Sequence, residues 1–162
     1  MFKIPFKKAN NQITAPVSGI YLPIEKVSDQ VFASKAVGDG FAISPNLNEE
    51  VIYSPVTGKV TSIFPTKHAI TLKINDGTEV LLHFGIDTVE LNGAPFEMLV
   101  SANQKVNNST PLVKVDWQQL VNAQKETSVI VVSANSTFSS NMDEKNNKVS
   151  KETVIGKFTL AK

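Results

Sequence analysis

Short runs of β-branched and aromatic residues, separated by proline, glycine and asparagine, dominate the pattern of hydrophobic and polar positions along this chain. Each run is typical of a strand, or of a strand with its turn, and the runs lie at residues 51–64, 68–74, 79–85, 111–116, 127–134 and 153–161. Only residues 116–124 show a helical pattern, with Asp116 as a candidate cap, and the polar segment 136–151 is typical of a loop. The pattern predicts an all-β protein, an antiparallel β-sandwich or flattened barrel with very little helix.

Two stretches of the sequence echo each other: residues 13–24, ITAPVSGIYLPI, and residues 52–63, IYSPVTGKVTSI. Both place a small residue before Pro-Val, then a hydroxyl residue, a glycine and a β run. Either two unrelated Pro-x-x-Gly turns or a duplicated β motif explains the echo, and the copies are too short to fold separately. We expect residues 13–162 to form a single domain, preceded by a flexible segment at residues 1–12.

The two histidines of the chain, His68 and His83, flank an Asp-Gly turn at residues 76–77. Asp-Gly favours a two-residue type I′ turn, which would set His83 opposite Ile70 and His68 opposite Gly85. Both imidazoles would then lie on one face of the hairpin as diagonal neighbours, with open space over the glycine. A register different by one residue would move them to opposite faces.

Two imidazoles on one face can serve several kinds of site. With Asp87 they can ligate zinc in a metal-dependent hydrolase. Alternatively, one imidazole attacks as a nucleophile while the other donates a hydrogen bond to the group that is received. Against the zinc site, the chain has no His-x-His or His-Glu-x-x-His spacing and no third histidine. A purely regulatory binding module is the third possibility.

The composition narrows the classes of function. The chain has no cysteine, which excludes disulfides and thiolate metal sites and suits a reducing cytoplasm. All 16 basic residues are lysines and the formal net charge is +1, without a basic stripe, so we expect no nucleic-acid partner. No apolar run approaches the ~20 residues that span a bilayer, so we expect no direct membrane insertion. Without arginine, the chain cannot supply an arginine finger for phosphoryl transfer from a nucleotide.

Residues 77–89, GTEVLLHFGIDTV, resemble the phosphorylation-site signature of the glucose-type enzyme IIA (EIIA) family of the bacterial phosphoenolpyruvate-dependent sugar phosphotransferase system. The signature is a glycine, two free positions, three apolar residues, His, apolar, Gly, apolar, a free position, Thr and a small apolar residue, and every fixed position is met. The likeness extends over residues 13–121. It includes APVSG at 15–19, VFASKAVGDGFAI at 31–43 and SPVTGKVTSIFPTKHAI at 54–70.

This resemblance implies roles for four residues. His83 would accept the phosphoryl group on Nε2, and His68 would stabilise the group; Thr66 would orient His68, and the carbonyl of Gly85 would orient His83 through Nδ1. The chain would be a cytoplasmic phosphoryl carrier that needs no metal or cofactor. It would receive the group from the phosphocarrier protein HPr and pass it to the enzyme IIB domain of a sugar transporter. The sugar, the transporter and any regulatory targets stay open.

The resemblance also implies a docking face around the histidine pair, apolar at its centre with acidic spots that would attract a basic carrier. Its apolar members are expected to be Val31, Phe32, Val37, Phe64, Leu81 and Val89. The acidic residues nearby are Asp29, Asp87 and Glu90. For these residues the alternative is an ordinary core and an ordinary charged surface.

Overall fold

A large antiparallel sheet organises the part of the chain that the computed structural model describes, residues 12–143 and 145–161. The strand order is β13-β2-β3-β11-β7-β6-β5-β9, so the central strands come from distant parts of the sequence. In that order the strands are Lys148–Val149, Gly19–Pro23, Asp39–Pro45, Val129–Ser133, Glu79–Phe84, Ala69–Lys73, Gly58–Ile63 and Lys105–Val106.

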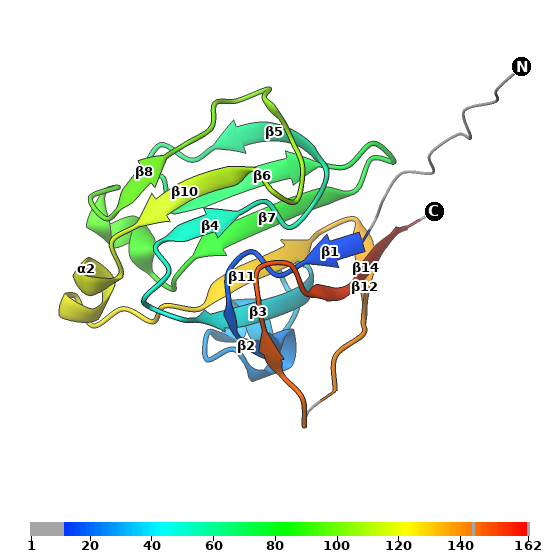
Figure 1. Ribbon diagram of the computed structural model, residues 1–162, viewed down its shortest axis with the longest axis horizontal. Coiled ribbons are helices and arrows are strands. Elements are labelled where there is room, and N and C mark those ends of the chain that lie inside the picture. The colour runs from blue at the N-terminus through cyan, green and yellow to red at the C-terminus, as the bar shows by residue number, and fades with distance from the viewer. Residues whose placement is uncertain (1–11, 144, 162) are drawn as a thin grey trace, which may run out of the picture.

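Two smaller antiparallel sheets lie in front of the large sheet in Figure 1 and cover one of its faces. The first has the order β1-β14-β12, with strands Gln12–Thr14, Val154–Leu160 and Ser136–Ser140. The second has the order β4-β10-β8, with strands Val51–Tyr53, Pro111–Val115 and Phe96–Met98. Fully buried side chains from all three sheets, including Phe41, Leu82, Val113 and Phe158, form one core between these layers. The predicted antiparallel β-sandwich is confirmed.

The opposite face of the large sheet carries a second, smaller apolar cluster beneath a helical segment. This segment comprises the 3-10 helix η1 at Ile24–Lys26 and the short helix α1 at Gln30–Ala33. Strand β11 is therefore buried on both faces: Val129 and Val131 enter the main core, while Ile130 and Val132 pack under the helical segment. Burial on both faces explains the unbroken apolar run in this strand.

Helix is scarce, as the pattern predicted, but its distribution differs from the prediction. Helix α2 spans Trp117–Asn122, within the range expected, although the Asp116 side chain accepts a hydrogen bond from the Gln119 side chain (3.0 Å) and does not cap the helix backbone. Helix α1 and the 3-10 helices η1 and η2 (Thr88–Leu91) were not predicted. The expected loop at 136–151 is also partly wrong, because β12 and β13 lie within it.

The two echoing stretches form matching substructures, since β1–β2 and β4–β5 are each a short strand, a Pro-x-x-Gly turn and a longer strand. They exchange equivalent hydrogen bonds: Thr14 N–H donates to the Pro55 carbonyl (2.9 Å) and Tyr53 N–H donates to the Pro16 carbonyl (2.8 Å). Their partners also correspond, because β14 and β13 pair with β1 and β2 as β10 and β9 pair with β4 and β5. The duplicated motif is the better explanation of the echo. Residues 1–11, most of the segment expected to be flexible, lie outside the described residues.

Candidate active site around the histidine pair

The hairpin of β6 and β7 carries the histidines, and its register differs by one residue from the prediction. Ala69, not Ile70, lies opposite His83. The connection is a three-residue loop, in which Gly77 N–H donates to the Ile74 carbonyl (2.9 Å) and Gly77 has a φ of +100°. Three-residue hairpin loops commonly end in a residue with positive φ, and Gly77 occupies that position. The predicted two-residue turn is therefore wrong, because Ile74 N–H donates to the Thr78 carbonyl (2.9 Å) and three residues lie between them. Ile70 consequently points into the core, away from His83.

The histidine rings nevertheless meet, because His68 lies just before the regular part of β6. The chain enters this strand through a tight turn in which Lys67 has a φ of +59° and its N–H donates to the Phe64 carbonyl (2.7 Å). His68 therefore precedes the residues that alternate between the two faces of the strand, Ala69–Lys73. The centroids of the two imidazole rings lie 5.1 Å apart, with an angle of 76° between their planes.

The turn after β7 orients the ring of His83. Gly85 has a φ of +77°, and its carbonyl oxygen lies 2.6 Å from Nδ1 of His83. A carbonyl can only accept a hydrogen bond, so Nδ1 carries the proton, and in the neutral ring Nε2 holds the free electron pair. The expected open space over Gly85 is not present: a Cβ atom there would lie 2.7 Å from Thr88 Cγ2 and 2.8 Å from Leu120 Cδ2.

The ring of His68 is held from the other side. Its Nδ1 lies 2.5 Å from the hydroxyl of Thr66, and only 8% of the residue is exposed. His83 is partly exposed, so a partner can reach the pair from the His83 side. The structure thus brings together the four residues to which the family resemblance gave roles, Thr66, His68, His83 and Gly85.

Burial lowers the pKa of both imidazoles below the ordinary value. For His83 the loss of solvation has the largest effect; positive charge on His68 lowers the pKa further, while the Gly85 carbonyl and the carboxylates of Asp29 and Asp87 raise it. Because the net effect lowers both pKa values, the neutral forms predominate at physiological pH. A neutral imidazole is the form that attacks as a nucleophile.

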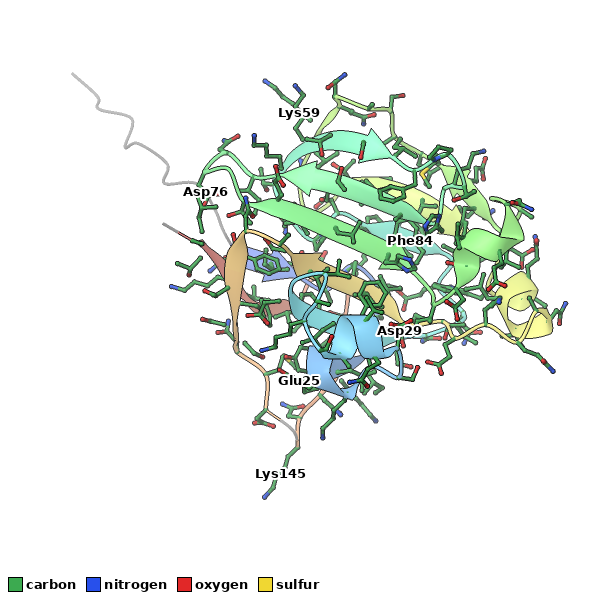
Figure 2. All side chains as sticks on the ribbon, turned by 180° about the vertical axis from the view of Figure 1, so that it is seen from behind. Glu25, Asp29, Lys59, Asp76, Phe84 and Lys145 are labelled. Atoms are coloured by element: carbon green, nitrogen blue, oxygen red, sulfur yellow. The ribbon has the colours of Figure 1, made fainter. Side chains whose placement is uncertain are left out.

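Two phenylalanine rings extend the pair into a row of four rings. Phe32, from α1, contacts His83 edge-on at a centroid distance of 5.1 Å, and Phe64 contacts His68 at 5.3 Å. Phe32 is buried and forms a wall of the site, whereas Phe64 is 37% exposed and forms its rim. Figure 2 labels Phe84 at the end of β7 and Asp29 at the start of the segment that supplies Phe32. The Asp29 side chain accepts hydrogen bonds from the backbone N–H groups of Val31 and Phe32, which caps α1.

The remaining residues of the expected docking face surround this row. Val31 and Val89 are exposed, and Val37 and Leu81 line, with Phe64, an apolar hollow of about 320 Å³. The acidic residues lie on the other side of the histidines: Asp29 and Asp87 line a polar hollow there, and Glu90 forms an ion pair with Lys125 (2.6 Å).

Sequence reasoning assigned no role to one buried residue of this turn. The side chain of Thr88 is fully buried and its hydroxyl donates to the Phe84 carbonyl (2.6 Å). The fixed position of this threonine in the signature at 77–89 is the feature of the sequence that could have indicated a role. The methyl group of Thr88 lies directly against Gly85.

The structure does not support the zinc hydrolase alternative. Among the described residues, no group of three or more His, Asp or Glu side chains is arranged to hold a metal ion. Nor does any helix in the described part of the chain have the length and hydropathy needed to cross a membrane.

The fold and the site together define a β-sandwich protein that presents one neutral imidazole, with the electron pair of Nε2 free, beside a second imidazole, an arrangement suited to receiving a transferable group. Residues 11–138 match the model of the family described as phosphoenolpyruvate-dependent sugar phosphotransferase system, EIIA 1. The chain belongs to this family, and it is a phosphoryl carrier in sugar uptake.

Individual relatives agree with this assignment over nearly the whole chain. The glucose-specific EIIA component of Staphylococcus aureus (strain MRSA252) is 40% identical over 167 aligned positions, covering 99% of each chain. The same component of Staphylococcus epidermidis (strain RP62A) is 39% identical over 168 positions, covering 99% of this chain and all of the relative. Among solved structures, the glucose permease IIA of Mycoplasma capricolum superposes with a TM-score of 0.78 at 31% identity, covering 95% of this chain and 98% of the other.

Proposed function

We propose that His83 is the residue that carries the phosphoryl group. Nε2 of the neutral ring attacks the phosphorus of a phosphohistidine on HPr, the new N–P bond forms as the old N–P bond breaks, and the leaving imidazole keeps its electron pair. The proton on Nδ1 stays in place. The observation that carries this proposal is the hydrogen bond from Nδ1 to the Gly85 carbonyl (2.6 Å), because it leaves Nε2 unprotonated and fixes the ring.

His68 stabilises the group once it has arrived. If the Thr66 hydroxyl donates to Nδ1 of His68, the ring proton resides on Nε2, which then donates to a phosphoryl oxygen. With its proton on Nδ1 instead, His68 would direct the electron pair of Nε2 toward the negatively charged phosphoryl oxygens and would not stabilise them. Thr66 therefore orients His68 as Gly85 orients His83. Phosphorylation leaves positive charge on the His83 ring, and the carboxylates of Asp29 and Asp87 favour that charge.

The surroundings of the pair suit a transient contact between proteins. An apolar hollow on one side and carboxylates on the other provide a surface for packing and a charge that attracts a basic carrier. We propose that HPr delivers the group here and that an enzyme IIB domain collects it at the same face. The carrier would act in the cytoplasm, with residues 13–162 as one domain. Because the relatives above are glucose-specific, glucose is the first sugar to test.

The test is phosphoryl transfer from labelled phosphoenolpyruvate through enzyme I and HPr to the purified protein. We expect the wild type to take up one acid-labile label and His83→Ala to take up none. His68→Ala should accept the label and deliver it poorly to an enzyme IIB domain. The double variant gives the background, because the chain has no other histidine. Normal labelling of His83→Ala would show that His83 is not the acceptor.

A further inference from the structure

The turn that follows β7 is closed by a buried hydroxyl. Thr88 has no exposed surface, and its Oγ1 donates to the carbonyl oxygen of Phe84 at 2.6 Å, four residues earlier. Its methyl group packs on Gly85, close enough that a Cβ atom on that glycine would lie 2.7 Å from Thr88 Cγ2. The hydroxyl therefore holds the peptide unit that precedes Gly85, and the methyl group fills the space beside the glycine.

The backbone groups of this turn have a complete set of partners. Phe84 N–H donates to the His68 carbonyl (2.8 Å), and Gly85 N–H donates to the Ser128 carbonyl (2.9 Å). The Gly85 carbonyl accepts from His83, and the Phe84 carbonyl accepts from Thr88. The peptide plane between residues 84 and 85 is thus held at its N–H by the neighbouring segment and at its oxygen by the threonine.

That plane leads into the next peptide plane, which contains the Gly85 carbonyl and whose N–H, on Ile86, donates to the Glu126 carbonyl (3.0 Å). The angle between the two planes depends on φ and ψ of Gly85. Rotation of the first plane changes φ at Gly85, and glycine offers little resistance of its own, because both signs of φ are accessible to it. A rotation would carry the Gly85 carbonyl away from Nδ1 of His83. Without that acceptor, the neutral ring is free to place its proton on either nitrogen.

We propose that Thr88 is a positioning residue for the phosphoryl acceptor: by holding the Phe84 carbonyl, it keeps the Gly85 carbonyl on Nδ1 and so keeps the electron pair of His83 on Nε2. This inference rests on the proposed role of His83 and adds a residue that touches neither histidine ring nor phosphoryl group. It also gives the threonine of the 77–89 signature a physical role.

The test separates the hydroxyl from the packing. Thr88→Ser keeps the hydroxyl and loses the methyl group, Thr88→Ala loses both, and Thr88→Val loses the hydroxyl alone. In each variant, ¹⁵N NMR of the imidazole nitrogens at neutral pH measures the tautomer of His83, and single-turnover transfer from phosphorylated HPr measures the rate. Thr78→Val is the matched control, because Thr78 is equally buried, its hydroxyl accepts from Ser136 (3.1 Å), and it lies at the far end of the hairpin.

We expect Thr88→Val and Thr88→Ala to raise the fraction of the Nε2-protonated tautomer and to slow transfer roughly 2- to 10-fold, the range for one hydrogen bond. Thr88→Ser and Thr78→Val should match the wild type in both measurements. If Thr88→Val cannot be purified in a folded state, comparison of Thr88→Ser with Thr88→Ala still isolates the effect of the hydroxyl. A wild-type tautomer in Thr88→Ala, or an equal shift in Thr88→Ser, would overturn the proposal. The tautomer is measured without phosphate, so this result is independent of whether His83 is the acceptor.

Discussion

Replacement of Gly85 by alanine tests whether the turn beside His83 is as constrained as the structure indicates. An alanine there must adopt a φ of +77°, which costs an L-residue about 1–2 kcal/mol. Its Cβ atom would also lie 2.8 Å from the Glu126 carbonyl oxygen, a backbone atom that cannot rotate away, and 2.7 Å from Thr88 Cγ2. Overpacking of this kind costs about 1–3 kcal/mol. The sum is a loss of about 2–5 kcal/mol in the free energy of unfolding.

Gly77→Ala provides the matched control. Gly77 also has a positive φ, +100°, but its added Cβ atom would meet only Leu160 Cδ2, at 3.7 Å, which is an ordinary contact. Both substitutions restrict the unfolded chain equally, so that contribution cancels between them. The difference between the two variants therefore isolates the crowding at Gly85, which we expect to be about 1–3 kcal/mol.

Urea denaturation followed by far-UV circular dichroism measures both free energies, and phosphoryl uptake from HPr measures the consequence for His83. We expect Gly85→Ala to be less stable than Gly77→Ala and, because its carbonyl must shift away from Nδ1, to accept the phosphoryl group more slowly even in its folded state. Gly77→Ala should accept it at the wild-type rate. Equal stability of the two variants would refute the packing argument, and normal uptake by Gly85→Ala would refute the role of the carbonyl.

Three further outcomes are expected. Thr66→Val should leave uptake of the phosphoryl group by His83 intact and slow its delivery to an enzyme IIB domain roughly 2- to 10-fold, because the hydroxyl that orients His68 is lost. Thr66→Ser keeps the hydroxyl and should stay close to the wild type. Unchanged delivery by Thr66→Val would contradict the orientation of His68 by the hydroxyl. Burial lowers the pKa of both histidines in the folded protein, so near and below the ordinary value of 6.5 the unfolded chain binds more protons than the folded one. The free energy of unfolding, measured by urea titration, should therefore decrease as the pH is lowered from about 8 to about 5. The decrease should be at most about 1.4 kcal/mol per pH unit for each histidine. A His68→Gln, His83→Gln double variant should lose this dependence, and a wild type more stable in acid would contradict it. Val31 is 55% exposed, so Val31→Ser should change the free energy of unfolding by less than about 0.5 kcal/mol while weakening transfer from HPr. Phe32→Ala should lower the free energy of unfolding by about 3–5 kcal/mol, because the ring is buried against His83. Equal losses of stability in the two variants would argue against the exposed docking face.

The sequence alone determined the class of fold and the identity of the central residues. Alternating runs rich in Val, Ile and Phe predicted the long strands, because the period of two that places side chains on opposite faces is a local property. The signature at 77–89 singled out His83 and Gly85 without any knowledge of their geometry. The echo of Pro-Val turns indicated the duplication that the exchanged hydrogen bonds at Pro16 and Pro55 support.

The register of the histidine hairpin shows where local reasoning failed. The Asp-Gly pair favoured a two-residue turn, but Leu72 pairs with Val80 and Ile70 with Leu82, all four buried in one core. Burial of these side chains on one face outweighs the preference of a turn, since a slip of one residue would expose half of them. The alternating apolar residues of both strands already contained this information, and the turn signal concealed it.

Only the tertiary structure decided how the site is assembled. The row of rings joins Phe32, Phe64, His68 and His83 from three separate segments, and the four-residue helix α1 that supplies Phe32 is too short to show a periodic pattern. Propensity and periodicity act between residues a few positions apart, whereas the pairing of β7 with β11 and the closure of the turn over Gly85 depend on side chains brought together from across the chain. The sequence therefore identifies which residues carry the chemistry, and long-range packing determines the tautomer, the burial and the direction in which they act.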